Sequence, residues 1–395
     1  EDGTTISDFD PEEAKRKASL SASVVPVEYE GIKYNLIDAP GLFDFEAGEY
    51  EGIRAAESVL VCVSGRSGVT VGAEKAFQLA RKNGKATMVF VSKCDLENAN
   101  YFKILEDMKI KFGSTVCPCV VPAKLDDGTP VYINLFSQKA FKYEGGKQIQ
   151  VELPDIGHRF QGLIEAMSEA IAETDDELME KFFDTMELSA QDMAKGLKIG
   201  VRDGSVCPVL CGSANTGLGV EMLLQTILDL APVATDMPAE AAQDDDGNDI
   251  EVAFDPNGPT AAIVFKTISD QYGKYSMIKV IRGKVTGDMA LYNPTTGNTE
   301  KLGRLYVMKG KKGEETKEIC CGDIGAIGKM DKVKTGDTLC DARKVISLAP
   351  IPYAEPNYSV AIAPKTRGQE DKVAQGLNRM NEEDPSFHVV NNAET

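Results

Sequence analysis

The chain has 395 residues, 42% of them apolar, and a formal net charge of −19 at pH 7. This length suffices for two or three domains with separate cores, and the lack of any long apolar run excludes a membrane-spanning helix. So acidic a surface argues against indiscriminate binding to DNA or RNA. A local basic cluster leaves open a contact with a ribonucleoprotein, or is simply a solvated hairpin tip: Lys309, Lys311, Lys312 and Lys317.

The nine cysteines are scattered and odd in number, which does not indicate a disulfide framework. The Cys117–Cys119 and Cys320–Cys321 pairs lack the spacing of zinc ligands, and His158 and His388 are the only histidines. We therefore expect most thiols to be small core residues in the reducing cytoplasm.

Residues 1–23 are polar and end in a small, hydroxyl-rich run from Ala18 to Ser23. Such a segment is typical of a flexible terminus. It also suits a switch loop in which Ser19 binds magnesium when a γ-phosphate is present. Because the chain opens on Glu1 rather than Met, we expect it to be a fragment of a longer protein.

An antiparallel hairpin is predicted from Val24–Tyr29 and Ile32–Ile37, which alternate around a Glu30-Gly31 turn. The second strand leads into Asp38-Ala39-Pro40-Gly41, and its apolar residues predict a buried strand that ends in a carboxylate and a turn. A carboxylate at the C-terminal end of a strand in an open α/β sheet lies where such folds bind ligands. In nucleotide-binding proteins such an Asp holds magnesium through water, and the Gly amide faces the γ-phosphate. By itself this tetrapeptide is equally typical of an ordinary strand and turn.

Strands and helices then alternate, which implies a parallel sheet with right-handed crossovers. We expect a helix at roughly Glu49–Ala56, a strand at Ser58–Ser64, a helix at Ala73–Asn83 and a strand at Ala86–Val91. The last strand leads directly into Ser92-Lys93-Cys94-Asp95, which resembles the Asn-Lys-x-Asp guanine motif of GTPases.

The residue types of this motif suit guanine. The Asp95 carboxylate can accept hydrogen bonds from N1 and N2 of guanine, whereas adenine has no donors there and would leave the carboxylate unpaired. The stem of Lys93 can lie along the base and ribose, and Cys94 is expected to serve packing. The motif gains weight because one β-α-β unit separates it from Asp38.

A third signature follows the predicted strand Val206–Leu210. It is Cys211-Gly212-Ser213-Ala214-Asn215, which resembles the Ser-Ala loop whose backbone amides contact guanine O6. Three signatures in this order predict a GTPase-type domain. The long interval before the third signature indicates an inserted subdomain, with strands at Pro130–Phe136 and Phe141–Glu144 and helices at Leu163–Ala172 and Glu177–Met186.

With these motifs, the chain resembles bacterial elongation factor G and its paralogues, the translational GTPases. Asp2–Thr5 and Ser7–Glu13 match the switch-I region of the paralogous branch, and Asp38–Gly41 with Asp44-Phe45 matches the third GTPase motif. The implied fold class is α/β: a P-loop-type GTPase domain without its N-terminal part, a translation-factor β-barrel and a partial α/β two-layer domain. The implied boundaries are 1–234 for the GTPase domain with its inserted subdomain at about 99–205, 235–257 for an acidic linker, 258–344 for the barrel, 345–355 for a second linker and 356–395 for the start of the third domain.

Short strands separated by Gly turns indicate the barrel. They are Ala261–Phe265, Tyr275–Arg282, Met289–Tyr292, Glu300–Met308 and Ile324–Gly328. A strand at Pro356–Pro364 and a helix at Gln369–Glu382 would begin the third domain. We expect the chain to correspond to the front and middle of such a factor, without its tRNA-mimicking C-terminal domains.

The resemblance implies that the chain binds GTP or GDP together with Mg²⁺. The implied ligand-binding residues are Asp38 and Ser19 for magnesium, Gly41 for the γ-phosphate, and Lys93, Asp95, Ser213, Ala214 and, more weakly, Ser92 for the guanine pocket. Ser92 stands where most GTPases have Asn, and it lacks the amide that tethers neighbouring loops.

Two departures from the family pattern bear on activity. No Gly-x-x-x-x-Gly-Lys-[Ser/Thr] phosphate loop occurs in the 395 residues, so we expect the chain to bind GTP poorly or not at all. Leu42 occupies the position of the His that orients the attacking water, and an aliphatic side chain cannot polarise water. No catalytic residue is therefore assigned, and a normal GTPase and a slow or altered one both remain open. A packing role for Leu42 fits either.

The function implied is a ribosome-dependent GTPase that couples hydrolysis to translocation or a related remodelling step. Its partner would be the ribosome, through rRNA and ribosomal proteins at the factor-binding site. We expect a cytoplasmic monomer with no DNA or membrane partner. A ribosomal-protection or regulatory paralogue is the alternative within the class. From another class, the alternative is a non-catalytic ribosome-binding module that keeps the GTPase fold only as a scaffold.

Overall fold

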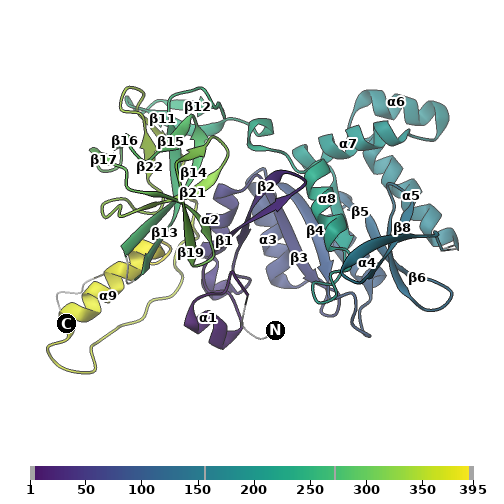
Figure 1. Ribbon diagram of the computed structural model, residues 1–395, viewed down its shortest axis with the longest axis horizontal. Helices are drawn as coiled ribbons and strands as arrows, with labels where there is room; N and C mark the ends of the chain where they lie inside the picture. Colours follow the sequence, from purple (N-terminus) through teal and green to yellow (C-terminus); the bar gives the residue numbers. More distant parts are fainter. Residues whose placement is uncertain (1–4, 155–156, 271–272, 391–395) are drawn as a thin grey trace. The chain divides into compact units, whose positions relative to one another are not determined.

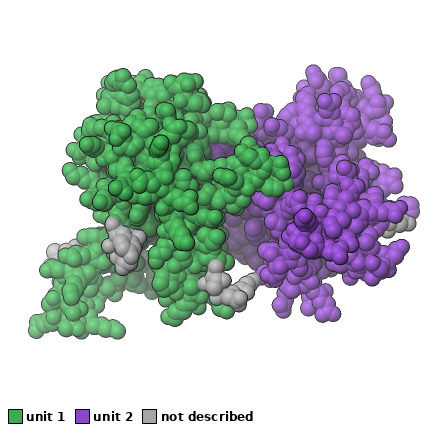
Figure 2. All heavy atoms as spheres, viewed as in Figure 1, with its two compact units in different colours: residues 1–55, 233–395 green, residues 56–232 purple. Residues whose placement is uncertain are grey.

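The computed structural model describes residues 5–154, 157–270 and 273–390, and divides the chain into two compact units (Figure 2). The barrel unit comprises residues 1–55 and 233–395, and the sheet unit comprises residues 56–232. Residues 2–4 of the predicted switch-region match lie outside the described residues. None of the described helices is both long and apolar enough to span a membrane.

The sheet unit is built on a four-stranded parallel sheet in the order β3-β4-β10-β5. The neighbouring strands β3 and β4 are labelled in Figure 1. Its strands are β3 (Ser58–Ser64), β4 (Ala86–Ser92), β10 (Cys207–Cys211) and β5 (Val116–Pro118). Its helices are α3 (Val71–Lys82), α4 (Tyr101–Phe112), α7 (Ala190–Asp203) and α8 (Val220–Leu230). The predicted alternation and parallel sheet are confirmed. β4 and β10 are apolar and buried almost throughout, as expected of strands covered on both faces.

The predicted insertion, at about 99–205, contains α4, β5 and α7 and, between β5 and α7, an antiparallel sheet and two helices. The sheet has the order β6-β7-β8-β9. Its strands are β6 (Val120–Lys124), β7 (Pro130–Asn134), β8 (Lys139–Glu144) and β9 (Lys147–Val151), and the helices are α5 (Gly157–Ala172) and α6 (Asp176–Thr185). These elements confirm the strands and helices predicted between the second and third signatures.

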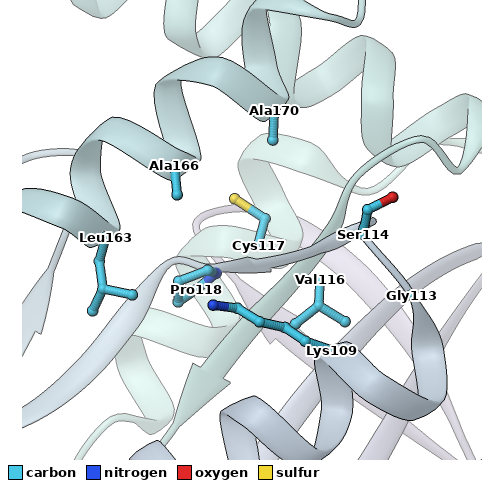
Figure 3. Close-up of a pocket in the computed structure, with 9 residues that line it drawn as sticks. All are labelled: Lys109, Gly113, Ser114, Val116, Cys117, Pro118, Leu163, Ala166 and Ala170. Carbon is cyan, nitrogen blue, oxygen red and sulfur yellow. The ribbon is translucent and has the colours of Figure 1, made fainter.

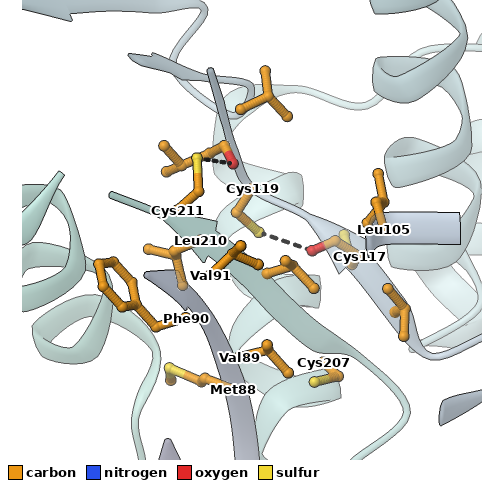
Figure 4. Close-up of a cluster of buried hydrophobic side chains, with 14 of the residues drawn as sticks. Met88, Val89, Phe90, Val91, Leu105, Cys117, Cys119, Cys207, Leu210 and Cys211 are labelled. Atoms are coloured by element: carbon orange, nitrogen blue, oxygen red, sulfur yellow. Dashed lines mark hydrogen bonds between the residues drawn. The ribbon is translucent and has the colours of Figure 1, made fainter. Parts of the chain in front are cut away.

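Several cysteines pack into the core of the sheet unit beside Val89 and Leu210 (Figure 4). The Cys119 thiol donates to the Cys117 carbonyl at 3.6 Å, and the Cys211 thiol donates to the Val120 carbonyl at 3.3 Å. Burial raises the pKa of the Cys207 thiol to about 12, so this thiol stays protonated. The expectation that most thiols are core residues is confirmed, since five of the nine are buried.

The barrel unit is built on an eight-stranded antiparallel sheet in the order β17-β16-β22-β13-β14-β21-β18-β19. Its strands are β13 (Ala261–Asp270), β14 (Gly273–Arg282), β16 (Ala290–Asn293), β17 (Asn298–Lys301), β18 (Leu305–Lys309), β19 (Lys312–Thr316), β21 (Ile324–Gly328) and β22 (Thr338–Cys340). A separate pair joins β15 (Lys284–Thr286) to β20 (Glu318–Cys320). The basic cluster lies at the exposed β18–β19 hairpin and just beyond it.

The single strand predicted at Glu300–Met308 is wrong, because the chain forms β17 and β18 with a break between them. Leu302 enters the core at this break, and Gly303 passes directly against the Gly328 carbonyl. The side-chain alternation alone did not reveal this close approach of two backbones.

Both segments expected as linkers contain paired strands. β11 (Glu240–Asp244) and β12 (Asp249–Val252) form a hairpin, and β23 (Ile346–Leu348) pairs with the other edge of β11. The Asp244 carboxylate holds the hairpin turn by accepting from the backbone N–H groups of Asp246 and Asn248. An acidic composition therefore marks a solvated hairpin here rather than an irregular connection.

The strand predicted at Pro356–Pro364 is also wrong, because these residues form no regular secondary structure, are almost wholly exposed and pair with no described strand. A strand requires a neighbour for its backbone hydrogen bonds, and alternating residues such as Tyr358 cannot supply one. The predicted helix that follows is confirmed as α9 (Glu370–Glu383), which packs on β13 through the Arg379 guanidinium and the Ser269 carbonyl.

The first 55 residues belong to the barrel unit. They form α1 (Pro11–Arg16), a hairpin of β1 (Ser23–Tyr29) and β2 (Ile32–Asp38), the short 3-10 helix η1 (Phe43–Phe45) and α2 (Ala47–Ala55). The hairpin is confirmed with its predicted turn. The prediction of β2 as a buried strand of an α/β sheet is wrong, because β2 pairs with no described strand except β1 and its residues are half-buried or exposed. The hairpin and α2 instead pack on the barrel through Val24, Ala55 and Phe265.

Candidate functional site

The candidate nucleotide residues are divided between the two compact units. The barrel unit holds the magnesium and γ-phosphate candidates Ser19, Asp38 and Gly41, together with Leu42. The sheet unit holds the guanine candidates Ser92, Lys93, Asp95, Ser213 and Ala214.

Asp38 is the last residue of β2, opposite Ser23 of β1, and its side chain is exposed. Gly41 lies three residues further on, in open space, because a Cβ added there would meet no atom within 4 Å. Neither crowding nor a positive φ requires glycine at this position. The Gly41 backbone is thus accessible to a ligand, as a γ-phosphate contact needs.

Gly48 of α2 positions the turn between these two residues. A Cβ at Gly48 would lie 2.6 Å from Cδ of Pro40 and 3.1 Å from the backbone nitrogen of Ala22. The absence of a side chain therefore lets the Pro40 turn and the entry to β1 pack directly on the helix. This role of Gly48 was not predicted from the sequence, where Gly48 stands directly before the predicted helix.

Ser19 is half-buried, and its hydroxyl donates to Oδ1 of Asp8 at 2.7 Å. The segment beside it is held by the buried carboxylate of Glu13, which accepts from the backbone N–H groups of Leu20 at 2.9 Å and Ser21 at 3.3 Å. Glu13 also completes the capping box of α1 with Asp10. The role of Glu13 was not predicted either, although the Asp10-x-x-Glu13 spacing is the signature of such a cap.

Leu42 precedes η1, and half of its side chain is exposed (50%). Its carbonyl accepts from the Phe45 N–H at 3.0 Å. The packing role considered for Leu42 is therefore not found, because its aliphatic side chain projects at the surface. An exposed aliphatic group at this position can neither donate to water nor accept from it.

The two guanine-motif loops meet in the sheet unit. Ser92 ends β4, and its hydroxyl donates to the Val63 carbonyl of β3 at 3.2 Å. The Cys94 N–H donates to the Gly212 carbonyl at 3.0 Å, which ties the second signature to the third. Ser92 thus tethers a neighbouring strand although it lacks the amide of the usual Asn.

The exposed groups of the second signature are Lys93 and Asp95. Lys93 adopts a left-handed backbone conformation with φ 57°, and this sharp turn follows directly on β4. The half-buried Cys94 between them packs against the core, as expected. A hydrogen bond with the Cys211 side chain is the main cause that lowers the pKa of the Cys94 thiol.

In the third signature, Ser213 organises the loop and Ala214 is exposed. Ser213 is buried, its N–H donates to the Leu218 carbonyl at 2.9 Å and its hydroxyl accepts from the Thr216 N–H at 3.3 Å. The Ser213 amide is therefore occupied within the loop. The exposed Ala214 backbone is the part of this pair available to a base.

These side chains suit a magnesium-bound guanine nucleotide in type. Asp38 and Ser19 offer carboxylate and hydroxyl oxygens, which are the ligands that Mg²⁺ prefers, usually in company with waters and substrate phosphates. Within the described residues no group of three or more His, Cys, Asp or Glu side chains could hold a metal ion by itself. Lys93 and Asp95 offer the charge and acceptor that guanine recognition needs.

A cavity of about 360 Å³ lies elsewhere in the sheet unit, between the end of α4, β5 and α5 (Figure 3). It is lined mainly by apolar side chains such as Val116, Leu163 and Ala166, with Lys109 and Ser114 also present. None of the candidate nucleotide residues lines it.

Three family models match successive parts of the chain. The Elongation factor Tu GTP binding domain matches residues 1–233. Elongation factor G domain 2 matches residues 259–342, and Elongation Factor G domain III matches residues 353–395.

Individual relatives match over nearly the whole chain. Elongation factor G of Ureaplasma parvum serovar 3 is 32% identical and covers 100% of this chain, which spans 58% of that protein. An elongation factor G-like protein of Thermotoga maritima is 31% identical over 97% of this chain, which spans 56% of that protein. A crystal structure of a protein from Thermus thermophilus is similar with a TM-score of 0.85 at 30% identity, over 100% of this chain and 57% of that one. The chain thus spans little more than half the length of these relatives.

Proposed function

Because the chain belongs to the elongation factor G-like family of translational GTPases, we propose that it is part of a ribosome-dependent GTPase that drives translocation or a related remodelling step. The observation that carries the proposal is the Cys94–Gly212 hydrogen bond, which joins the two guanine-motif loops. Lys93, Asp95 and Ala214, which belong to these two loops, are exposed.

Five of the candidate residues have defined tasks in this proposal. The Asp95 carboxylate accepts from the Watson–Crick edge of guanine, and the Lys93 stem covers the base. Asp38 and Ser19 hold magnesium, which when bound neutralises charge on the phosphates. Gly41 offers its backbone N–H to the γ-phosphate. The partner proposed is the ribosomal factor-binding site, reached by a cytoplasmic monomer.

The first prediction concerns guanine recognition. We expect Asp95→Asn to weaken GDP binding and to favour a xanthine nucleotide, because the new amide can donate to the O2 that replaces the guanine amino group. The measurement is a titration of the chain with GDP, XDP and ADP in the presence of magnesium, read by NMR chemical shifts. Asp126→Asn, an exposed change in the β6–β7 turn of the same unit, is the matched control.

We expect GDP and GTP to bind the 395-residue chain no more tightly than roughly the high-micromolar range, since it contains no phosphate-loop motif. ADP and ATP should bind more weakly still. Equal shifts with adenine and guanine nucleotides, or an unchanged preference in Asp95→Asn, would contradict the proposed recognition.

A slow or altered GTPase of the paralogous type is the second candidate, and the exposed Leu42 side chain favours it. We expect Leu42→His to raise ribosome-stimulated GTP hydrolysis about tenfold or more at saturating GTP, because a positioned imidazole can orient and polarise water. Leu36→His changes another exposed leucine of the same segment and serves as control. If the unsubstituted chain hydrolyses GTP measurably, and as fast as the variant, the slow-GTPase candidate fails.

A further inference from the structure

Lys266 of β13 is a buried cation that contacts two other segments of the barrel unit. Only 5% of the residue is exposed. Its Nζ donates to Oγ of Ser21 at 2.9 Å and to Oε2 of Glu51 at 3.3 Å. Ser21 precedes β1 and Glu51 lies on α2, so a single ammonium group joins three separate elements.

The connection to a fourth segment runs through Glu51, which is itself only 2% exposed. The Tyr353 hydroxyl, in the stretch that leads from β23 towards α9, donates to Oε1 of Glu51 at 3.4 Å. The same elements also share an apolar cluster, which includes Ala55 of α2 and Phe265 of β13. Ser21, Glu51, Lys266 and Tyr353 are named the Lys266 junction.

A buried ion pair of this kind is weak evidence for stability, because the cost of desolvating both charges offsets their attraction. Burial is the largest influence on Glu51 and raises its pKa to about 6, although the neighbouring Lys266 ammonium acts in the opposite direction. Such pairs are best attested where they fix the relative arrangement of elements or serve in a switch. A role for the Lys266 junction is therefore to be expected in the arrangement of the joined elements rather than in stability.

The elements joined by Lys266 carry the proposed phosphate-sensing residues. Ser21 is two residues from the magnesium candidate Ser19, and α2 follows the γ-phosphate candidate Gly41 after one short turn. We propose that Lys266 is a positioning residue that couples these two segments to each other and to the barrel. Movement of either segment then changes the hydrogen bonds of the other through one shared ammonium group. The inference rests on the proposed function for its purpose, but the coupling itself requires no nucleotide.

The test is amide hydrogen exchange of the nucleotide-free 395-residue chain, read by mass spectrometry in the peptides over 19–24 and 47–55. We expect Ser21→Ala to accelerate exchange in α2, and Glu51→Gln to accelerate exchange around Ser21, each about fivefold. Both cross-effects should vanish in a Lys266→Met background and persist with Lys266→Arg, which keeps the charge. Ser23→Ala is the matched control, because the Ser23 hydroxyl is buried but has no hydrogen-bond partner among the described residues.

Effects confined to each variant's own segment would overturn the coupling. So would equal acceleration throughout β13 and β14, since this would indicate a purely structural role. If Lys266→Met does not fold, the Ser21→Ala and Glu51→Gln cross-effects still decide the question. A parallel titration with GTP and ATP separates the two proposals. Cross-effects together with equal shifts for GTP and ATP would refute the proposed guanine recognition alone, and guanine-selective shifts without cross-effects would refute the junction alone.

Discussion

The buried carboxyl group of Glu51 makes the stability of the folded chain depend on pH. Desolvation raises its pKa from the ordinary 4.5 to about 6, against the lowering by Lys266 and by the Tyr353 hydroxyl, while Asp384 adds to the rise. Because the folded-state pKa is the higher one, the folded chain binds more protons between these two values. The contribution of Glu51 to stability is therefore fully present below pH 4.5 and is lost as the pH rises through about 6.

We expect the stability difference between the unsubstituted chain and Glu51→Gln to change by about 2 kcal/mol across this pH window, at 1.36 kcal/mol per pKa unit. The unsubstituted chain should lose stability relative to the variant as the pH rises, since glutamine does not titrate. Urea unfolding between pH 4 and 7.5, followed by a probe in the barrel unit, measures this difference. A difference that is flat across the window would show that Glu51 does not titrate there.

At the scale of an element, α2 shows how two glycines in one helix differ. Gly48 lies against the Pro40 ring and the backbone of Ala22, whereas a Cβ at Gly52 would make ordinary contacts with Ile37 at 3.4 Å and Ala39 at 3.8 Å. The first glycine is required by a close approach. The second only weakens the helix, because glycine is a poor helix former.

We expect Gly48→Ala to destabilise the barrel unit by about 1–3 kcal/mol, because the rigid proline ring and a backbone atom must move. Gly52→Ala should be neutral or should stabilise the unit by about 0.5–1 kcal/mol through helix propensity. Urea unfolding of the two variants at one pH compares the same substitution within a single helix. Equal effects would contradict the close approach at Pro40.

At the scale of the whole molecule, one compact unit is built from two segments that are separated in the sequence by the other unit. Residues 1–55 join residues 233–395 through the apolar contacts of β1 and α2 and through polar contacts across the barrel unit. Asp323 accepts from Nζ of Lys33 at 2.8 Å and from the Asn35 side chain at 2.8 Å. The Arg54 guanidinium pairs with Glu240 at 3.0 Å.

We expect Asp323→Asn to destabilise the barrel unit by about 1 kcal/mol, because the partly exposed Lys33 ammonium loses its charged acceptor. Asp331→Asn, an exposed change in the same unit, should have little effect. In calorimetry the loss should appear in the unfolding of the barrel unit and leave that of the sheet unit unchanged. A shift of the sheet-unit transition instead would contradict the observed division.

The sequence by itself predicted those strands, helices and turns that depend on side-chain periodicity and turn residues within one segment. The parallel strands Ser58–Ser64 and Ala86–Ser92, the β1–β2 hairpin and four of the five predicted barrel strands follow from side-chain periodicity and turn residues. The family matches confirm the predicted fold class and the resemblance. The roles of the individual site residues stay predictions, although the structure brings the two guanine-motif loops together.

Only the tertiary structure decided which segments find a partner. The alternating residues of Pro356–Pro364 lack a described strand to pair with, whereas the acidic stretch before the barrel forms the β11–β12 hairpin. β2 is half-exposed because β1 is the one described strand that pairs with it, and because only part of β2, such as Ile37, packs on the apolar cluster of the barrel unit. The contacts of Lys266 with Ser21 and Glu51 join residues more than 200 positions apart. Periodicity describes a segment and its own faces, but burial and pairing depend on segments that are distant in the sequence.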